Sequence, residues 1–119
     1  MPAGRQIIQS YGDNRFRIAG TVHDGSVLTF LDETIPWPVT SAENITFESL
    51  KQVVDLEDVP GILIIGCGEK FLPPPIELSI ELREHGVVVE WMDTGAACRT
   101  FNVLLGEERH VAAALLAVA

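Results

Sequence analysis

Hydrophobic and polar residues alternate along the first third of the chain. Residues 15–18 (Arg-Phe-Arg-Ile) show the period of two that is typical of a β-strand with one buried face. The polar segments 12–14 and Asp24-Gly25 read as turns, and Asp24-Gly25 is also a two-residue hairpin signal. The pattern therefore predicts β structure over residues 6–39, with a return strand at 26–31.

Apolar residues next to prolines occur twice in the sequence. Residues 35–39 (Ile-Pro-Trp-Pro-Val) are predicted to be extended, at a sheet edge or in a lid, because proline disfavours the α conformation of the preceding residue. Trp37 in this segment, and Phe71 and Leu72 before Pro73–Pro75, are apolar residues on predicted loops. They can fold back on the core or form an exposed patch for a protein partner, and the sequence leaves both interpretations open.

A strand–helix–strand unit is predicted from the apolar runs in the middle of the chain. Residues 62–65 (Ile-Leu-Ile-Ile) form a continuous apolar run, which is typical of a strand covered on both faces. Pro75 suits the first turn of a helix and Gly86 its end. A second buried strand follows at 87–92, and we expect the two strands to be parallel neighbours in a right-handed βαβ unit.

Three further helices are expected. One lies within residues 41–58, where Thr46 is a good N-cap residue. Another begins at Asp93 or Thr94 and runs to about Leu105, and a last apolar helix covers Val111–Ala119. The alternation of strands and helices places the chain in the α/β class.

Size, composition and charge fit a single domain covering residues 1–119. Hydrophobic residues make up 47% of the chain and charged residues 21%, which excludes a disordered protein. The net charge of −9 opposes binding to nucleic acid or to anionic lipid headgroups, since both require a basic patch. The charge leaves basic or neutral protein partners open, and no cofactor is predicted.

The cysteines and the N-terminal segment predict a reduced, cytoplasmic environment. Cys67 and Cys98 form neither a disulfide framework nor a zinc motif. Residues 1–6 lack the apolar region of a signal peptide, and no apolar run approaches the roughly 20 residues that a membrane span needs. We expect a protein without direct membrane insertion, for which membrane contact is possible only through a partner.

Two polar turns follow the two predicted parallel strands. Gly66-Cys67-Gly68 follows the first strand, and Asp93-Thr94 follows the second. Because ligands in such sheets bind beyond the carboxyl ends of the strands, we expect a candidate site where these turns face one another. Cys98 and Arg99 lie in the first turns of the helix that follows.

Each polar residue of this corner has a structural and a functional interpretation. Cys98 lies where the helix dipole stabilises a thiolate, although a free cysteine is more often buried. Cys67 is expected to be the more exposed thiol, but no histidine is near in sequence to act as its base. Asp93 can cap the helix or pair with Arg99, and Arg99 can instead bind a carboxylate of a ligand or partner.

Nucleotide and metal chemistry are not predicted. The turn at 66–68 lacks the third glycine of a dinucleotide fingerprint and the lysine–serine pair of a P-loop. His23, His85 and His110 are expected in three separate turns, which argues against a shared metal site.

Residues 92–102 (Met-Asp-Thr-Gly-Ala-Ala-Cys-Arg-Thr-Phe-Asn) closely resemble a motif of one family of small proteins. That family contains a Mth-like domain, and it includes mitochondrial assembly factors for respiratory complex I and an animal adipogenesis-associated protein. Further segments that resemble family signatures are 25–27, 37–39, 65–68 and 111–115, so the resemblance covers nearly the whole chain. The family typically has Gly-Thr-Gly where this chain has Cys67, which argues against an essential thiol or hydroxyl there.

The resemblance implies a three-layer α/β fold, with a central mixed sheet, helices on both sides and an N-terminal β layer. It supplies no catalytic mechanism, because the family has no settled enzyme activity. It implies a protein partner, with subunits of a respiratory membrane complex as candidates.

Two functional hypotheses follow. The first is a non-enzymatic interaction protein that helps to assemble a respiratory membrane complex of the complex I type. The second is a small-ligand-binding protein or enzyme with a site formed by Cys67, Asp93, Cys98 and Arg99, which requires a pocket between the two turns and a reactive thiol. The candidate contact residues for a ligand or partner are Gly66, Cys67, Gly68, Asp93, Thr94, Cys98, Arg99, Trp37 and Phe71.

Overall fold

The computed structural model describes residues 3–119, so the first two residues of the segment 1–6 lie outside the described part. The strands are β1 (Ile8–Gly12), β2 (Arg15–Ile18), β3 (Thr21–Asp24), β4 (Val27–Thr29), β5 (Thr34–Pro36), β6 (Ile62–Gly66), β7 (Val88–Met92) and β8 (Val111–Leu115). The α-helices are α1 (Lys51–Val54), α2 (Ile76–Glu84) and α3 (Thr94–Gly106), and two 3₁₀ turns are η1 (Ala42–Asn44) and η2 (Glu48–Leu50).

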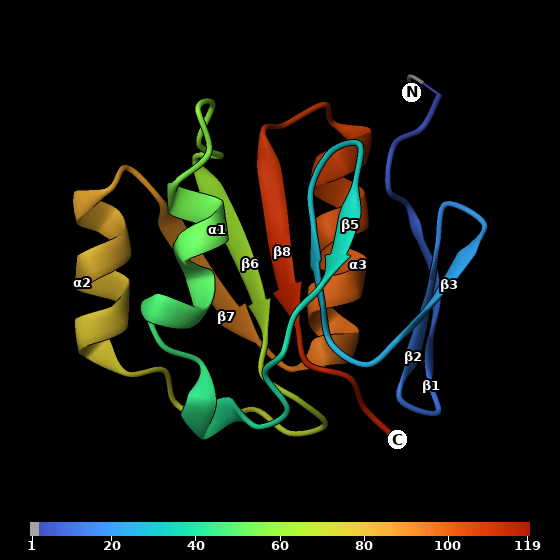
Figure 1. Ribbon diagram of the computed structural model, residues 1–119, viewed down its shortest axis with the longest axis horizontal. Helices are drawn as coiled ribbons and strands as arrows, with labels where there is room; N and C mark the ends of the chain where they lie inside the picture. The colour runs from blue at the N-terminus through green and yellow to red at the C-terminus, as the bar shows by residue number, and fades with distance from the viewer. Residues whose placement is uncertain (1–2) are drawn as a thin grey trace.

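The molecule has three layers around a central mixed sheet. This sheet has the strand order β5-β4-β8-β6-β7, and α1 and α2 cover one of its faces (Figure 1). The other face is covered by α3, beside which the antiparallel sheet β1-β2-β3 packs. The predicted fold class is therefore confirmed, including the helices on both sides and the N-terminal β layer.

The strand–helix–strand unit forms as the sequence predicts, but the expectation that its second strand is buried is wrong, because β7 is a partly exposed strand at the edge of the sheet. Strands β6 and β7 are parallel neighbours, with Ile62 opposite Val88 and Gly66 opposite Met92. Successive residues of β6 face opposite sides of the sheet, so that Leu63 packs with α1 and α2 while Ile64 packs with α3. Both faces are therefore apolar, which explains the uninterrupted hydrophobic run of this strand.

The apolar helix predicted over Val111–Ala119 is wrong. Residues 111–115 form β8, which lies in the middle of the sheet between antiparallel β4 and parallel β6. Its residues are buried on both faces, and this burial overrides the helix propensity of its three alanines. The small alanine side chains let α3 on one side and the α1–α2 layer on the other pack close to the sheet.

The hairpin predicted at Asp24-Gly25 is also wrong. Strand β3 ends at Asp24, and the chain then crosses to the central sheet, where β4 pairs with β5 and β8. The tight hairpins lie instead at Asp13-Asn14 and Ala19-Gly20, where all four residues have positive φ angles of 49–84°. Such angles match the primed turns that join twisted antiparallel strands.

The first predicted helix is present but short, since η2 and α1 together cover only part of residues 41–58. The Thr46 hydroxyl oxygen accepts a hydrogen bond of 3.2 Å from the Ser49 N–H, as an N-cap residue does. Helix α3 begins directly after Asp93, within the predicted limits.

Helix α2 carries apolar side chains on two opposite faces. Leu78 and Leu82 are buried against the sheet, whereas Ile76 and Ile80 are exposed. Residues four positions apart share a face of a helix, so these are two separate rows, each one turn long. The two rows together produce the alternating apolar pattern of residues 76–82, which resembles a strand pattern although the segment is helical.

Candidate functional site

The two polar turns at the ends of β6 and β7 meet as predicted. Beyond the last paired residues, the Cys67 N–H donates a hydrogen bond of 2.8 Å to the Met92 carbonyl oxygen. The Thr94 N–H donates one of 2.9 Å to the Gly68 carbonyl oxygen. The parallel pairing therefore continues into the turns, and the turns are in direct contact.

Thr94 connects three elements at this corner. Its side chain is fully buried, and its hydroxyl donates a hydrogen bond of 2.8 Å to the Leu116 carbonyl oxygen just after β8. The same oxygen accepts a hydrogen bond of 3.1 Å from the Gly68 N–H after β6. The hydroxyl thus has both a donor and an acceptor partner within the protein, and its role is structural.

Gly66 is needed because α3 approaches β6 so closely. A Cβ atom on Gly66 would lie 2.9 Å from the Thr94 Cα atom and 3.1 Å from the Ala97 Cβ atom. The nearer contact is with backbone, which cannot move aside without displacing the helix. The space that a ligand would need at this point is filled by protein.

Asp93 caps helix α3. Its carboxylate accepts a hydrogen bond of 2.9 Å from the Ala96 N–H, which supports the capping interpretation. Within residues 3–119 no ion pair joins Asp93 to Arg99. Arg99 itself is exposed and remains available to a ligand or partner.

Cys98 is buried between α3 and the sheet, where it packs in the same cluster as Ile64 and Phe101. Burial raises the pKa of its thiol from 9.0 to about 12, while the charge of Arg99 lowers it and that of Asp93 raises it. Burial outweighs the helix dipole, so the thiol is neutral near pH 7. This arrangement does not support the reactive thiol that the ligand hypothesis requires.

Cys67 is buried as well, so the expectation of an exposed thiol is wrong. Its Sγ atom lies 3.4 Å from the Lys70 carbonyl oxygen. A hollow of about 380 Å³ does lie beside Cys67 and Gly68, but its other walls are Glu69, Lys70, Leu72 and residues 40–42 and 116–119. It does not lie between the turns 66–68 and 93–94.

The other side of the corner is closed by the N-terminal sheet. A Cβ atom on Gly95 would lie 2.6 Å from the Tyr11 hydroxyl oxygen, so Tyr11 of β1 covers this glycine. In the described part of the chain, every buried side-chain nitrogen or oxygen has a hydrogen-bond partner. No buried polar group is therefore left over at the corner to hold a ligand.

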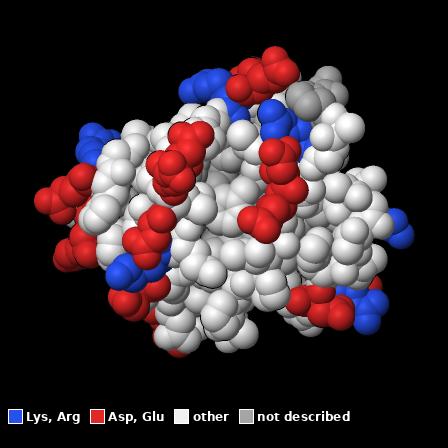
Figure 2. Space-filling view, turned by 45° about the horizontal axis from the view of Figure 1, so that its top comes forward, with Lys and Arg blue, Asp and Glu red and all other residues white. Residues whose placement is uncertain are grey.

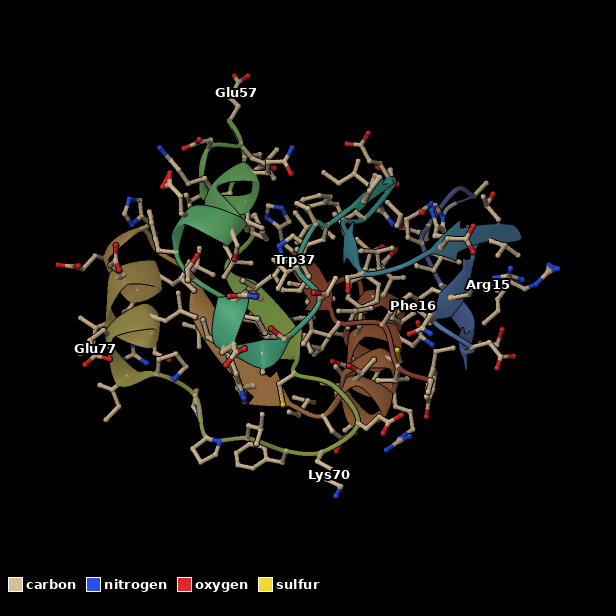
Figure 3. The ribbon with its side chains drawn as sticks, turned by 60° about the horizontal axis from the view of Figure 1, so that its bottom comes forward. Arg15, Phe16, Trp37, Glu57, Lys70 and Glu77 are labelled. Carbon is tan, nitrogen blue, oxygen red and sulfur yellow. The ribbon has the colours of Figure 1, made fainter. Side chains whose placement is uncertain are left out.

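The two proline-flanked apolar segments behave differently. Trp37 is only 3% exposed, and its Nε1–H donates a hydrogen bond of 2.8 Å to the Ser49 carbonyl oxygen. It lies well inside the molecule, whereas Lys70 extends outward (Figure 3). Trp37 thus covers the core and is not exposed to a partner, so the prediction of Trp37 as a contact residue is wrong. Phe71, by contrast, is 57% exposed and Leu72 is 49% exposed.

Exposed apolar side chains continue from Phe71 and Leu72 into α2, where Ile76 is 71% exposed and Ile80 is 56% exposed. The Trp91 Nε1–H donates a hydrogen bond to the Leu72 carbonyl oxygen and holds this segment against β7. We call Phe71, Leu72, Ile76 and Ile80 the α2 apolar surface. Ile76 and Ile80 are not among the contact residues predicted from the sequence, although an alternating apolar pattern on a helix requires half of its apolar residues to face outward.

The fold and its close-packed corner define a three-layer α/β domain. The chain belongs to the protein family described as "Protein of unknown function (DUF498/DUF598)", whose pattern matches residues 8–116. No helix in residues 3–119 is long and apolar enough to cross a membrane.

Similar proteins come from bacteria and animals. An outer membrane protein from Bartonella henselae has the same fold, with a TM-score of 0.89 and 39% identity over 98% of each chain. A Mth938-like domain from Bordetella pertussis has a TM-score of 0.84 and 26% identity, over 98% of this chain and 88% of the other. The NADH dehydrogenase [ubiquinone] 1 alpha subcomplex assembly factor 3 of Danio rerio is 36% identical over 92% of this chain. The aligned part is 63% of that animal protein, so the chain spans less than two thirds of its length. The predicted membership in the family of the complex I assembly factors is confirmed.

Replacing Gly66 by alanine tests the close approach of α3 to β6. We expect Gly66→Ala to lower the free energy of unfolding by about 1–3 kcal/mol, because the added methyl group overlaps the helix backbone. The matched control is Gly61→Ala, where a Cβ atom has nothing within 4 Å and the change should cost less than about 0.5 kcal/mol. Urea unfolding of both variants measures the difference, and equal effects would contradict this packing.

Alkylation tests the state of the Cys98 thiol. In a Cys67→Ala variant at about pH 8, the shift from 9.0 to about 12 should lower the thiolate fraction of Cys98 roughly a thousandfold. We therefore expect iodoacetamide to modify the native protein very slowly and the urea-unfolded protein fast, as followed by mass spectrometry. Similar rates in the two states would restore the hypothesis of a reactive thiol at this corner.

Proposed function

We propose that this chain is a non-enzymatic interaction protein that helps to assemble a respiratory membrane complex of the complex I type. The observation that carries the proposal is the α2 apolar surface, where four large apolar side chains are about half exposed or more. Ile76 and Ile80 are neighbours on one face of α2 and line one hollow, and neighbouring exposed apolar residues of this kind mark protein-interaction sites. The partner identity in this proposal rests on the family membership.

The geometry of α2 supports a contact function rather than a purely structural one. Ile76 and Ile80 lie on the helix face opposite the buried Leu78 and Leu82, so they point directly away from the core. A shallow hollow of about 410 Å³ runs along this face, lined by Pro74, Ile76, Ser79, Ile80, Arg83 and Glu84. An apolar side chain of a partner fits a hollow of this kind.

The name of the animal relative supports an assembly role, because that protein is called an assembly factor of NADH dehydrogenase. This chain covers one part of such a protein, and we propose that the shared domain is the part that contacts a partner. Arg99 is exposed on α3, on the other side of the sheet, and it is the residue of the strand-end corner that a partner could also contact.

Replacing both isoleucines of α2 by glutamate tests this function. The doubly substituted Ile76→Glu/Ile80→Glu protein should lose its partner in a pull-down from detergent-solubilised membranes, because two charges would be buried unpaired in the interface. The fold should be retained, since both side chains are exposed. Wild type should recover subunits of a respiratory complex, identified by mass spectrometry.

Two further variants make the result specific. Val22→Glu on β3 changes another exposed apolar residue to glutamate, and it should keep the partner. Arg99→Ala shows whether the corner takes part in the contact. If wild type and the α2 variant recover the same subunits, the α2 apolar surface is not the contact with the partner. Failure of wild type to recover any respiratory subunit would argue against the assembly role itself.

A further inference from the structure

A different surface lies at the opposite end of the central sheet, near the amino ends of β6 and β8. Two hollows of about 210 and 400 Å³ meet there and share Phe30, Glu33 and Leu56 as lining residues. We call the combined depression the acidic groove. Figure 2 shows a hollowed, uncharged area between groups of acidic side chains on this side of the molecule.

The walls of the acidic groove come from two separate parts of the chain. The turn between β4 and β5 supplies residues 30–35, and α1 with the loop after it supplies residues 52–60. Val111, the first residue of β8, is buried at its base. Phe30 and Ile35 are partly buried and Leu56 is exposed, so the surface between the charged walls is apolar.

Carboxylates dominate the walls of this groove. The charged or titratable side chains that line it are Asp32, Glu33, Asp55, Asp58 and His110, and neither a lysine nor an arginine lines either hollow. Asp32 is neutralised by Arg5 at 2.7 Å, and His110 Nδ1 lies 4.0 Å from Asp58. Glu33 and Asp55 take part in no ion pair anywhere in residues 3–119. The carboxylates of Glu33 and Asp55 therefore face the groove from opposite walls, and neither has an ion-pair partner among the described residues.

We propose that the acidic groove binds a basic segment of a partner protein and takes up at least one of its arginine side chains. A guanidinium group offers several donors in a fixed plane, which suits carboxylates that approach from two sides. The aliphatic stem of the arginine would pack on Phe30 and Leu56 while its charge reaches Glu33. The groove thus offers both kinds of contact that an arginine side chain makes.

The charge of the groove selects this occupant over others. A second copy of the chain would bring its own net charge of −9 and would be repelled. Among the described side chains, no group of three or more histidine, cysteine, aspartate or glutamate residues could hold a metal ion. The α2 apolar surface lies on another part of the molecule, so this inference stands or falls independently of the proposed function.

The experiment uses a fluorescein-labelled synthetic peptide of alternating arginine and leucine, followed by fluorescence anisotropy at low salt. Wild type should bind it, and the doubly substituted Glu33→Lys/Asp55→Lys protein should bind at least about tenfold more weakly. The matched control is Glu77→Lys/Glu81→Lys, which makes the same change in net charge on α2 and should stay within about twofold of wild type. A peptide with glutamate in place of arginine should not bind.

Several outcomes would overturn the proposal. If the groove variant and the α2 control lose the same affinity for the peptide, the binding is only a general attraction to an acidic protein. If wild type does not bind the peptide, the groove does not bind a basic segment. Displacement of the peptide by millimolar calcium, but not by equal ionic strength of sodium chloride, would identify a cation site instead. The Glu33→Gln/Asp55→Asn variant removes the two charges without reversing them, and it should lose less affinity for the peptide than the lysine variant does. Thermal unfolding checks that this variant is folded. If the folded variant binds the peptide as tightly as wild type, the proposal is contradicted.

Discussion

The packing of the α3 N-terminus against the end of β6 is the constraint on which the rest of the structure depends. Gly66 lets the helix backbone approach to a distance that any side chain would block, and the buried Thr94 hydroxyl then bonds to the chain after β6 and after β8. Because β8 is the central strand, this one contact sets the position of α3 against three strands. The neighbouring Asp93 caps the same helix turn.

This constraint also explains why the corner with the most chemically versatile residues is a structural element. A helix held so closely to the sheet buries Cys98, and burial keeps its thiol protonated. The space that would hold a substrate is taken by the contact between Gly66 and Thr94, and Tyr11 covers Gly95. Polar residues at these strand ends therefore stabilise the domain.

The sequence predicts most local features and the parallel pairing of β6 with β7, but it does not predict the pairing of β8 or the path of the chain after Asp24. The period-two pattern, the caps at Thr46 and Asp93, and the apolar run of β6 each follow from neighbouring residues, and the structure has them. The identity of β8 as a strand depends on β4 and β6 on either side of it, which residues 111–115 do not encode locally. The same limit applies to Trp37, because its ring is buried in a core cluster whose other members come from distant parts of the chain.

The exposed surfaces could be inferred from the sequence only in part, for a related reason. A helix pattern shows that half of the apolar residues in 76–82 must face outward, but it does not show what lies next to them. The acidic groove is formed by residues 30–35 and 52–60, which meet only in the fold. The proposed occupant of the α2 apolar surface is an apolar segment, whereas that of the acidic groove is a basic segment. A partner that carries both kinds of segment would bind more tightly overall than either segment alone, because the second contact would form within the complex.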